Sequence, residues 1–128
     1  MNRSIVITAT ILLISGIVFG AFGAHSLKAL LSPEKMSSFE TGIKYQFYMG
    51  LGQLILGVNH DRFGISLKWV YRFNLIGVLF FSGSIYLLAL EDVLSVNMSF
   101  LWPITPIGGL LLIIGWTLLL IGLLRKKA

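Results

Sequence analysis

The stretch Ser4–Leu27, SIVITATILLISGIVFGAFGAHSL, runs for 24 residues without an Asp, Glu, Lys or Arg. An α-helix rises about 1.5 Å per residue, so about 20 apolar residues cross the hydrocarbon core of a bilayer. Three more uncharged runs follow, of 15, 18 and 32 residues, at Tyr45–Asn59, Phe73–Leu90 and Val93–Leu124. The pattern predicts an all-α membrane protein with four transmembrane helices.

The composition supports this prediction. Hydrophobic residues make up 56% of the 128 residues and charged residues only 12%, whereas soluble domains carry about a quarter charged residues. The absence of cysteine excludes disulfides and thiolate chemistry. The net charge of +5 fits positive residues at helix ends better than a nucleic-acid surface, and we expect no nucleic-acid partner.

We expect one membrane domain, residues 1–128, with its four helices packed as an antiparallel bundle. A cleaved signal peptide is disfavoured at the start because only Arg3 precedes a long apolar run. Pro106 as the first residue of the last helix, with Thr105 as its cap, divides the 32-residue run. The expected spans are about 5–24, 41–60, 73–90 and 106–124.

A short amphipathic helix is predicted between the first two spans. Ser32 can cap a helix that has Pro33 in its first position. Residues 34–44 then place Met36 and Phe39 on one face, as in a helix that lies in the membrane interface. The second transmembrane span would begin at about residue 41, near the end of this short helix.

Positive residues predict the orientation. With both termini in the cytoplasm, seven Lys and Arg residues lie inside and three outside. Cytoplasmic loops of membrane proteins are enriched in Lys and Arg. We therefore predict a multi-pass protein of the bacterial inner membrane with cytoplasmic N- and C-termini.

Small residues recur within the spans. Gly16, Gly20 and Ala24 share one stripe of the first helix, and Gly108 and Gly109 lie in the last. In lipid, such stripes let helix backbones approach closely and mark packing seams. The alternative is that the glycines make room for a ligand or a flexing helix.

Four polar side chains fall near the estimated midplane, one on each helix: Ser15, Gln53, Ser82 and Trp116. An unpartnered amide in hydrocarbon costs several kcal/mol. We therefore expect Gln53 to point inward and bond to one of the other three. A hydrogen-bonded layer that holds the helices together is one interpretation, and a solute- or lipid-binding role is the other.

A second set of polar residues is expected at the outer ends of the helices: His25, Tyr45, Gln46, Tyr86 and Thr105, with Glu91 beside them. One interpretation is helix capping plus the aromatic belt of a membrane interface. The other is an outward-facing site for a lipid head group or a substrate.

The sequence shows no catalytic or metal-binding constellation. The spacing of His, Asp and Glu suggests no metal site, and no Ser-His-acid set suggests a nucleophile. No charged residue falls at membrane depth, which weighs against an ion-coupled transporter. We expect no enzyme activity and no cofactor.

Several motifs resemble one family. Gly20-Ala21-Phe22-Gly23-Ala24-His25 resembles the opening signature of the YgdD/YwdK family of small bacterial membrane proteins, domain of unknown function 423, to which the eukaryotic transmembrane protein 256 group looks related. Met49 departs from the pattern, which often has His there. The other matches, in chain order, are Thr41-Gly42, Tyr45-Gln46-Phe47-Tyr48, Phe81 to Leu90, Thr105 to Gly109, and Gly115-Trp116.

The resemblance implies a four-helix membrane protein without an assigned activity. Together with the residues, it predicts a non-enzymatic inner-membrane protein that packs with itself, with another membrane protein or with lipid. The alternative is a transporter of small solutes or lipid formed by an oligomer, because four short helices fill their own centre.

Overall fold

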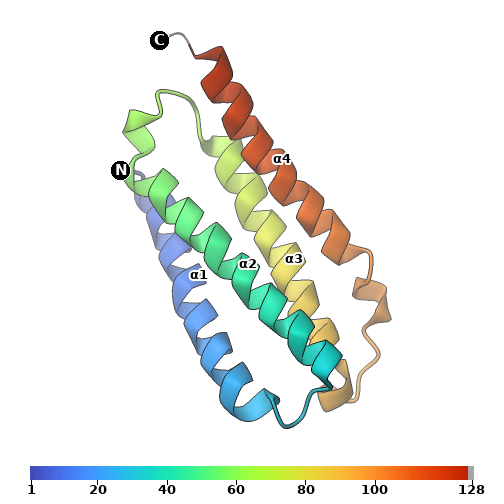
Figure 1. Ribbon diagram of the computed structural model, residues 1–128. Helices are drawn as coiled ribbons and strands as arrows, with labels where there is room; N and C mark the ends of the chain where they lie inside the picture. Colours follow the sequence, from blue (N-terminus) through green and yellow to red (C-terminus); the bar gives the residue numbers. More distant parts are fainter. Residues whose placement is uncertain (127–128) are drawn as a thin grey trace.

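The computed structural model describes residues 1–126, which contain helices and no strand. Each of the four long helices runs antiparallel to the next (Figure 1). The start of α1 and the end of α4 lie at one end of the molecule, and the α1–α2 and α3–α4 connections lie at the other. The predicted all-α class is confirmed. The helices are α1 (Arg3–Phe22), α2 (Pro33–Val58), α3 (Lys68–Leu94) and α4 (Ile104–Arg125).

Three helical segments of the described chain are long and apolar enough to cross a membrane: 3–27, 68–94 and 99–125. The segment containing α2 is not among them. Its apolar half carries Gln46 and Gln53, which lower its hydropathy. The helix nevertheless packs against both α1 and α3, so its polar residues can be shielded by its neighbours.

The prediction of a separate interfacial helix at residues 34–44 is wrong. The start of α2 is as predicted, because Ser32 Oγ accepts from the backbone N–H of Lys35 at 3.2 Å and Pro33 follows the cap. The helix then continues to Val58 without a break. No second proline interrupts it, and one buried stripe with i+3 and i+4 spacing runs along its whole length. This stripe contains Phe39, Gly42, Gln46, Gly50, Gln53, Leu56 and Gly57.

The other boundaries differ from the predicted spans by a few residues. A five-residue π-helix, Gly23–Leu27, extends α1, and α3 begins at Lys68, five residues before the predicted span. Helix α4 begins at Ile104, so Thr105 does not cap it. The Thr105 hydroxyl instead forms a hydrogen bond with Ser84.

The helices do not close evenly around one axis. Extensive contacts join α1 to α2, α2 to α3 and α3 to α4, and α1 and α4 lie on opposite sides of the α2–α3 pair (Figure 1). Outward-facing residues on the two flanking helices are apolar: Ile11 is 58% exposed and Ile113 is 65% exposed. Such a surface suits lipid as the solvent, because large exposed apolar patches are rare in soluble proteins.

Candidate functional site

A groove lies between α1 and α3, with α2 at its base; we call it the α1–α3 groove. Its volume is about 420 Å³. Side chains on its walls, such as Phe22, Leu79 and Leu87, remain 43–57% exposed, so the groove is open along its side. The walls are almost entirely apolar, including Phe19 of α1 and Leu90 of α3.

Gln46 forms the polar base of the groove. Its side chain is only 4% exposed. The amide Nε2 donates to the backbone O of Leu12 at 2.8 Å and to Ser15 Oγ at 2.7 Å. The amide Oε1 accepts from the Tyr86 hydroxyl at 2.5 Å. One side chain of α2 therefore joins α1 to α3 across the base.

Tyr86 is held in place by close packing on α2. A Cβ atom at Gly42 would lie 2.7 Å from Tyr86 Cε1, so only glycine leaves room for the ring. The ring also packs edge-on against Phe19, with centroids 5.2 Å apart. Next to it, Ser82 Oγ donates to the backbone O of Gly42 at 2.7 Å. The α2–α3 seam therefore fixes the position of the Tyr86 hydroxyl.

Gln53 forms a second polar cluster nearer the chain termini. It is fully buried. Its Nε2 donates to Thr8 Oγ1 at 2.5 Å and to the backbone O of Ile5 at 3.3 Å. Its Oε1 accepts from Asn74 Nδ2 at 3.0 Å. This cluster links the same three helices, α1, α2 and α3, as the Gln46 cluster does.

The bonding direction in the Gln53 cluster is fixed by α1. A backbone carbonyl can only accept, so the Gln53 group that faces Ile5 O must be the N–H₂. The Gln53 oxygen then faces Asn74, whose own amide nitrogen must donate. Asn74 is 1% exposed, and its Oδ1 is left without a hydrogen-bond partner. The cluster therefore carries one buried acceptor that no donor satisfies.

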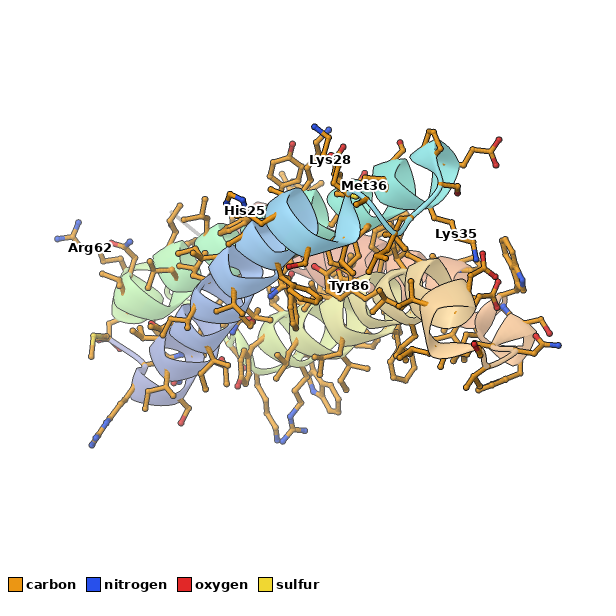
Figure 2. All side chains as sticks on the ribbon, turned by 90° about the horizontal axis from the view of Figure 1, so that it is seen from below. His25, Lys28, Lys35, Met36, Arg62 and Tyr86 are labelled. Carbon is orange, nitrogen blue, oxygen red and sulfur yellow. The ribbon has the colours of Figure 1, made fainter. Side chains whose placement is uncertain are left out.

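The structure brings together two of the five residues predicted for the outer cluster, Gln46 and Tyr86. His25 is exposed on the π-helix and lies away from Tyr86 (Figure 2). Tyr45 packs on Phe81, with ring centroids 4.8 Å apart. Thr105 pairs with Ser84 between α3 and α4. Whether this end of the protein binds a head group stays a prediction.

The predicted midplane layer is not a single layer. Gln53 is buried and bonded across helices, as expected, but its partners are none of the three predicted residues. Ser15 bonds to Gln46 and Ser82 to Gly42. The Trp116 indole N–H faces Met49 Sδ at 3.2 Å. The cause is the length of α2, which starts at Pro33 and so places Gln46, not Gln53, level with the middle of α1.

The small residues have different surroundings. A Cβ on Gly16 would meet the Phe47 ring at 3.1 Å, and one on Gly108 would overlap the backbone of Phe81. These two glycines lie at helix seams, as predicted. A Cβ on Gly20 would meet nothing within 4 Å, and Ala24 is exposed. A Cβ on Gly109 would make ordinary contact with the Phe81 ring, at 3.6 Å.

Thr8 and Asn74 were missed by the sequence analysis. Asn74 is the second residue of an uncharged run that begins at Phe73, which suggested a helix end. Because α3 begins at Lys68, Asn74 lies inside the helix. Its amide was the available signal, since an Asn within a membrane helix needs a partner.

The chemistry of the groove is that of a binding surface. The donors of Gln46 and Tyr86 are committed to protein acceptors, and Ser15 Oγ donates to the backbone O of Ile11 at 2.8 Å. Within residues 1–126, no three His, Cys, Asp or Glu side chains are grouped to hold a metal. The groove therefore offers apolar contact over a base whose donors are already satisfied.

Comparison with known proteins places the chain in a family. The model for "Protein of unknown function (DUF423)" matches residues 19–109. A UPF0382 membrane protein of Staphylococcus haemolyticus is 47% identical over 102 residues, which cover 80% of each chain. The UPF0382 inner membrane protein YgdD of Escherichia coli is 39% identical over 119 residues, which cover 89% of this chain and 86% of YgdD. No solved structure matches the chain.

These matches confirm the resemblance predicted from the motifs, which begin at Gly20 inside the matched region. The relationship to the eukaryotic transmembrane protein 256 group stays a prediction. The relatives are named as membrane proteins, in agreement with the three apolar helical segments of this chain. The protein belongs to the DUF423 family, whose UPF0382 members are bacterial membrane proteins of unknown function.

Proposed function

We propose that all four helices cross the cytoplasmic membrane and that both termini are cytoplasmic. Close contacts support a full crossing by α2: a Cβ on Gly57, near its end, would lie 2.9 Å from Val6, and one on Gly23 would lie 2.8 Å from Phe39, near its start. Helix α2 therefore accompanies α1 over the length of that span. The described cations at the end that holds the start of α1 are Arg3, Arg62, Lys68, Arg72, Arg125 and Lys126, against one acid, Asp61.

A reporter fused after Ala128 tests this orientation. We expect a β-galactosidase fusion to be active and an alkaline phosphatase fusion to be silent, because the enrichment in Lys and Arg retains this end inside. A third fusion in the Val96–Asn97 loop should show the opposite activities. Phosphatase activity at the C-terminus would reverse the assignment.

We propose that the protein acts without catalysis, as an accessory membrane protein that binds lipid in the α1–α3 groove. The observation that carries this proposal is the combination of apolar walls, an open side and a base in which Gln46 and Tyr86 bond to each other. An acyl chain makes dispersion contacts and needs no hydrogen bond, so it matches this surface. A polar solute would lose its hydration without gaining donors from the base.

The lipid that surrounds the helices is the expected occupant of the α1–α3 groove. A groove that opens sideways from membrane helices meets acyl chains before it meets water. Its volume of about 420 Å³ suits one or two chain segments rather than a helix of a partner protein, because an α-helix with its side chains is about 10 Å wide. The comparisons give the alternative of a transporter no support, and we do not propose it.

Filling the groove tests the proposal. A Cβ on Gly83, which lines the groove, would meet nothing within 4 Å, so the side chain of Gly83→Leu starts in open space and adds bulk to the groove. We expect the purified variant to retain about half of the wild-type phospholipid in mild detergent, because the new side chain occupies the space of an acyl chain. Mass spectrometry of extracted lipid measures the change.

Gly20→Leu is the matched control. Gly20 also lies in a membrane helix with open space beside it, but it does not line the groove. Its variant should retain wild-type lipid. Equal lipid retention in Gly83→Leu and the wild type would reject the groove as a lipid site. A change of oligomeric state in Gly83→Leu alone would also reject it, in favour of a second copy or a membrane-protein partner as the occupant.

A further inference from the structure

A second cavity lies at the end of the molecule opposite the termini, where α2, α3 and the start of α4 meet; we call it the Lys35 pocket. Its volume is about 520 Å³. Lys35 comes from the first turn of α2, Glu91 from the end of α3, and Trp102 and Thr105 from the segment around the start of α4. Three separate parts of the chain therefore form its lining.

Its mouth is charged. Lys35 Nζ lies 2.9 Å from Asp92 Oδ2 and 3.3 Å from Glu91 Oε1, and the Lys35 side chain points toward the end of α3 (Figure 2). The hydrogen bond that Lys35 donates to Asp92 raises the pKa of Lys35 above its ordinary value, so Lys35 stays charged at neutral pH. Glu91 also accepts from the backbone N–H of Met98 at 3.2 Å. Lys35 and Glu91 line the pocket, and Asp92 adjoins it through its ion pair with Lys35, so the three side chains give this mouth a net charge of −1.

The rest of the pocket is mainly apolar, with three hydroxyl side chains in its lining: Ser38, Thr41 and Thr105. Ile85, Leu88 and Ala89 of α3 line it below the charged groups, further along the helix toward the membrane centre. Trp102 lines the rim and is 66% exposed, as is usual for tryptophan at a membrane–water interface. The pocket thus has a charged mouth and a mainly apolar interior, which is the division found in a phospholipid.

We propose that the Lys35 pocket binds a phospholipid whose head group carries a primary ammonium, from the leaflet at this end of the helices. Asp92, 77% exposed at its side chain, accepts from the ammonium. Lys35 has three N–H donors, and its two carboxylate contacts leave one for the phosphate. The acyl chain lies along Ile85 and Leu88.

The net charge of the mouth favours a head group that carries a positive charge. A phospholipid with an uncharged alcohol head group brings only its negative phosphate, which the second carboxylate repels. An ammonium-bearing head group places its positive charge on that carboxylate and its phosphate on Lys35. Each charge near a membrane surface contributes about 1 kcal/mol, which corresponds to a preference of about fivefold. The inference does not depend on the α1–α3 groove, which is lined by other residues of α2 and α3.

A competition experiment tests the proposal. The full-length protein in detergent is titrated with an equimolar mixture of palmitoyl-oleoyl phosphatidylethanolamine and phosphatidylglycerol, and bound lipid is counted by native mass spectrometry. We expect about fivefold more bound phosphatidylethanolamine in the wild type. Asp92→Asn should bring the ratio near one, and Glu91→Gln combined with Asp92→Asn should favour phosphatidylglycerol, because Lys35 then remains as the only charge at the mouth.

Asp61→Asn is the matched control. Asp61 is 78% exposed and pairs with the N-terminal amine at 2.7 Å, so its replacement changes the same charge and breaks a similar ion pair at the other end of the protein. This variant should keep the wild-type ratio. The proposal fails if the wild type binds phosphatidylglycerol at least as well, if Asp92→Asn keeps the wild-type ratio, or if Asp61→Asn changes the ratio as much as Asp92→Asn does.

Discussion

Gly108→Ala is expected to lower the free energy of unfolding by about 3 kcal/mol, at the upper end of what overpacking usually costs. The added Cβ would overlap the backbone N of Phe81 and lie 2.8 Å from its Cα and 2.9 Å from the backbone O of Gly77. These are backbone atoms of α3 and cannot rotate away as a side chain can. The substitution must therefore push α4 away from α3 along one of the most extensive helix contacts of the fold.

Gly109→Ala is the control one residue along the chain. Its Cβ would make ordinary contact with the Phe81 ring at 3.6 and 3.8 Å. Alanine favours a helix over glycine by about 1 kcal/mol, so this variant should be as stable as the wild type or slightly more stable. Unfolding of both variants in mixed micelles measures the difference. Equal stability of the two variants would show that α3 and α4 do not approach as closely as the structure has them.

Gly108 and Gly109 show which part of helix packing the sequence predicts and which part it does not. Their place in an apolar helix predicted a packing role for both, because small residues permit close approach. Their different surroundings depend on the rotation of α4, which places Gly108 on the backbone of α3 and Gly109 beside a ring. Rotation is set by contacts from other helices. A stripe of small residues on one helix therefore predicts a seam but does not select the residue at its centre.

The depth of polar residues was harder to predict than the number of helices. Uncharged runs indicated four helices, but α2 extends well before its run, which begins at Tyr45. Lys35 and Lys44 belong to this helix, although charge normally marks a helix end. With the centre of α2 misplaced, Gln46 was predicted at an outer end and Gln53 at the middle. An interhelical partner was expected for Gln53 alone, because it was placed at membrane depth. The interhelical bonds of Gln46 were not predicted.

Neither cavity was predictable from the chain alone. The α1–α3 groove exists because α1 packs mainly on α2 and does not close against α3. The sequence of α1 gives no sign of this, since apolar residues surround the whole helix. In lipid the outward side is as apolar as the packed side, and hydrophobic periodicity loses its value as a signal. The groove is therefore a property of the helix arrangement and not of the α1 sequence.

Gln53→Leu is expected to destabilise the protein by about 2 kcal/mol, more than the average interhelical hydrogen bond in a membrane protein. The reason is the fixed bonding direction of the cluster. Without the Gln53 oxygen, Asn74 Nδ2 loses the acceptor of its 3.0 Å hydrogen bond. The Oδ1 of the same side chain already lacks a hydrogen-bond partner. Asn74 Nδ2 then keeps only its long contact with the backbone O of Met49, at 3.5 Å. Insertion into the membrane should be unaffected, since leucine increases the hydropathy of α2.

The double variant Gln53→Leu with Asn74→Leu separates a polar penalty from a packing defect. If Gln53→Leu destabilises the protein by leaving the buried Asn74 amide without its acceptor, an apolar side chain of the same branching at position 74 should restore part of the stability. We expect it to recover about 1 kcal/mol of the free energy of unfolding. The two changes would then be non-additive, as expected for residues that share a hydrogen bond. Unfolding of the four proteins in the cycle measures the coupling between the two sites. Additive losses would mean that the 3.0 Å contact between Gln53 and Asn74 contributes nothing to stability.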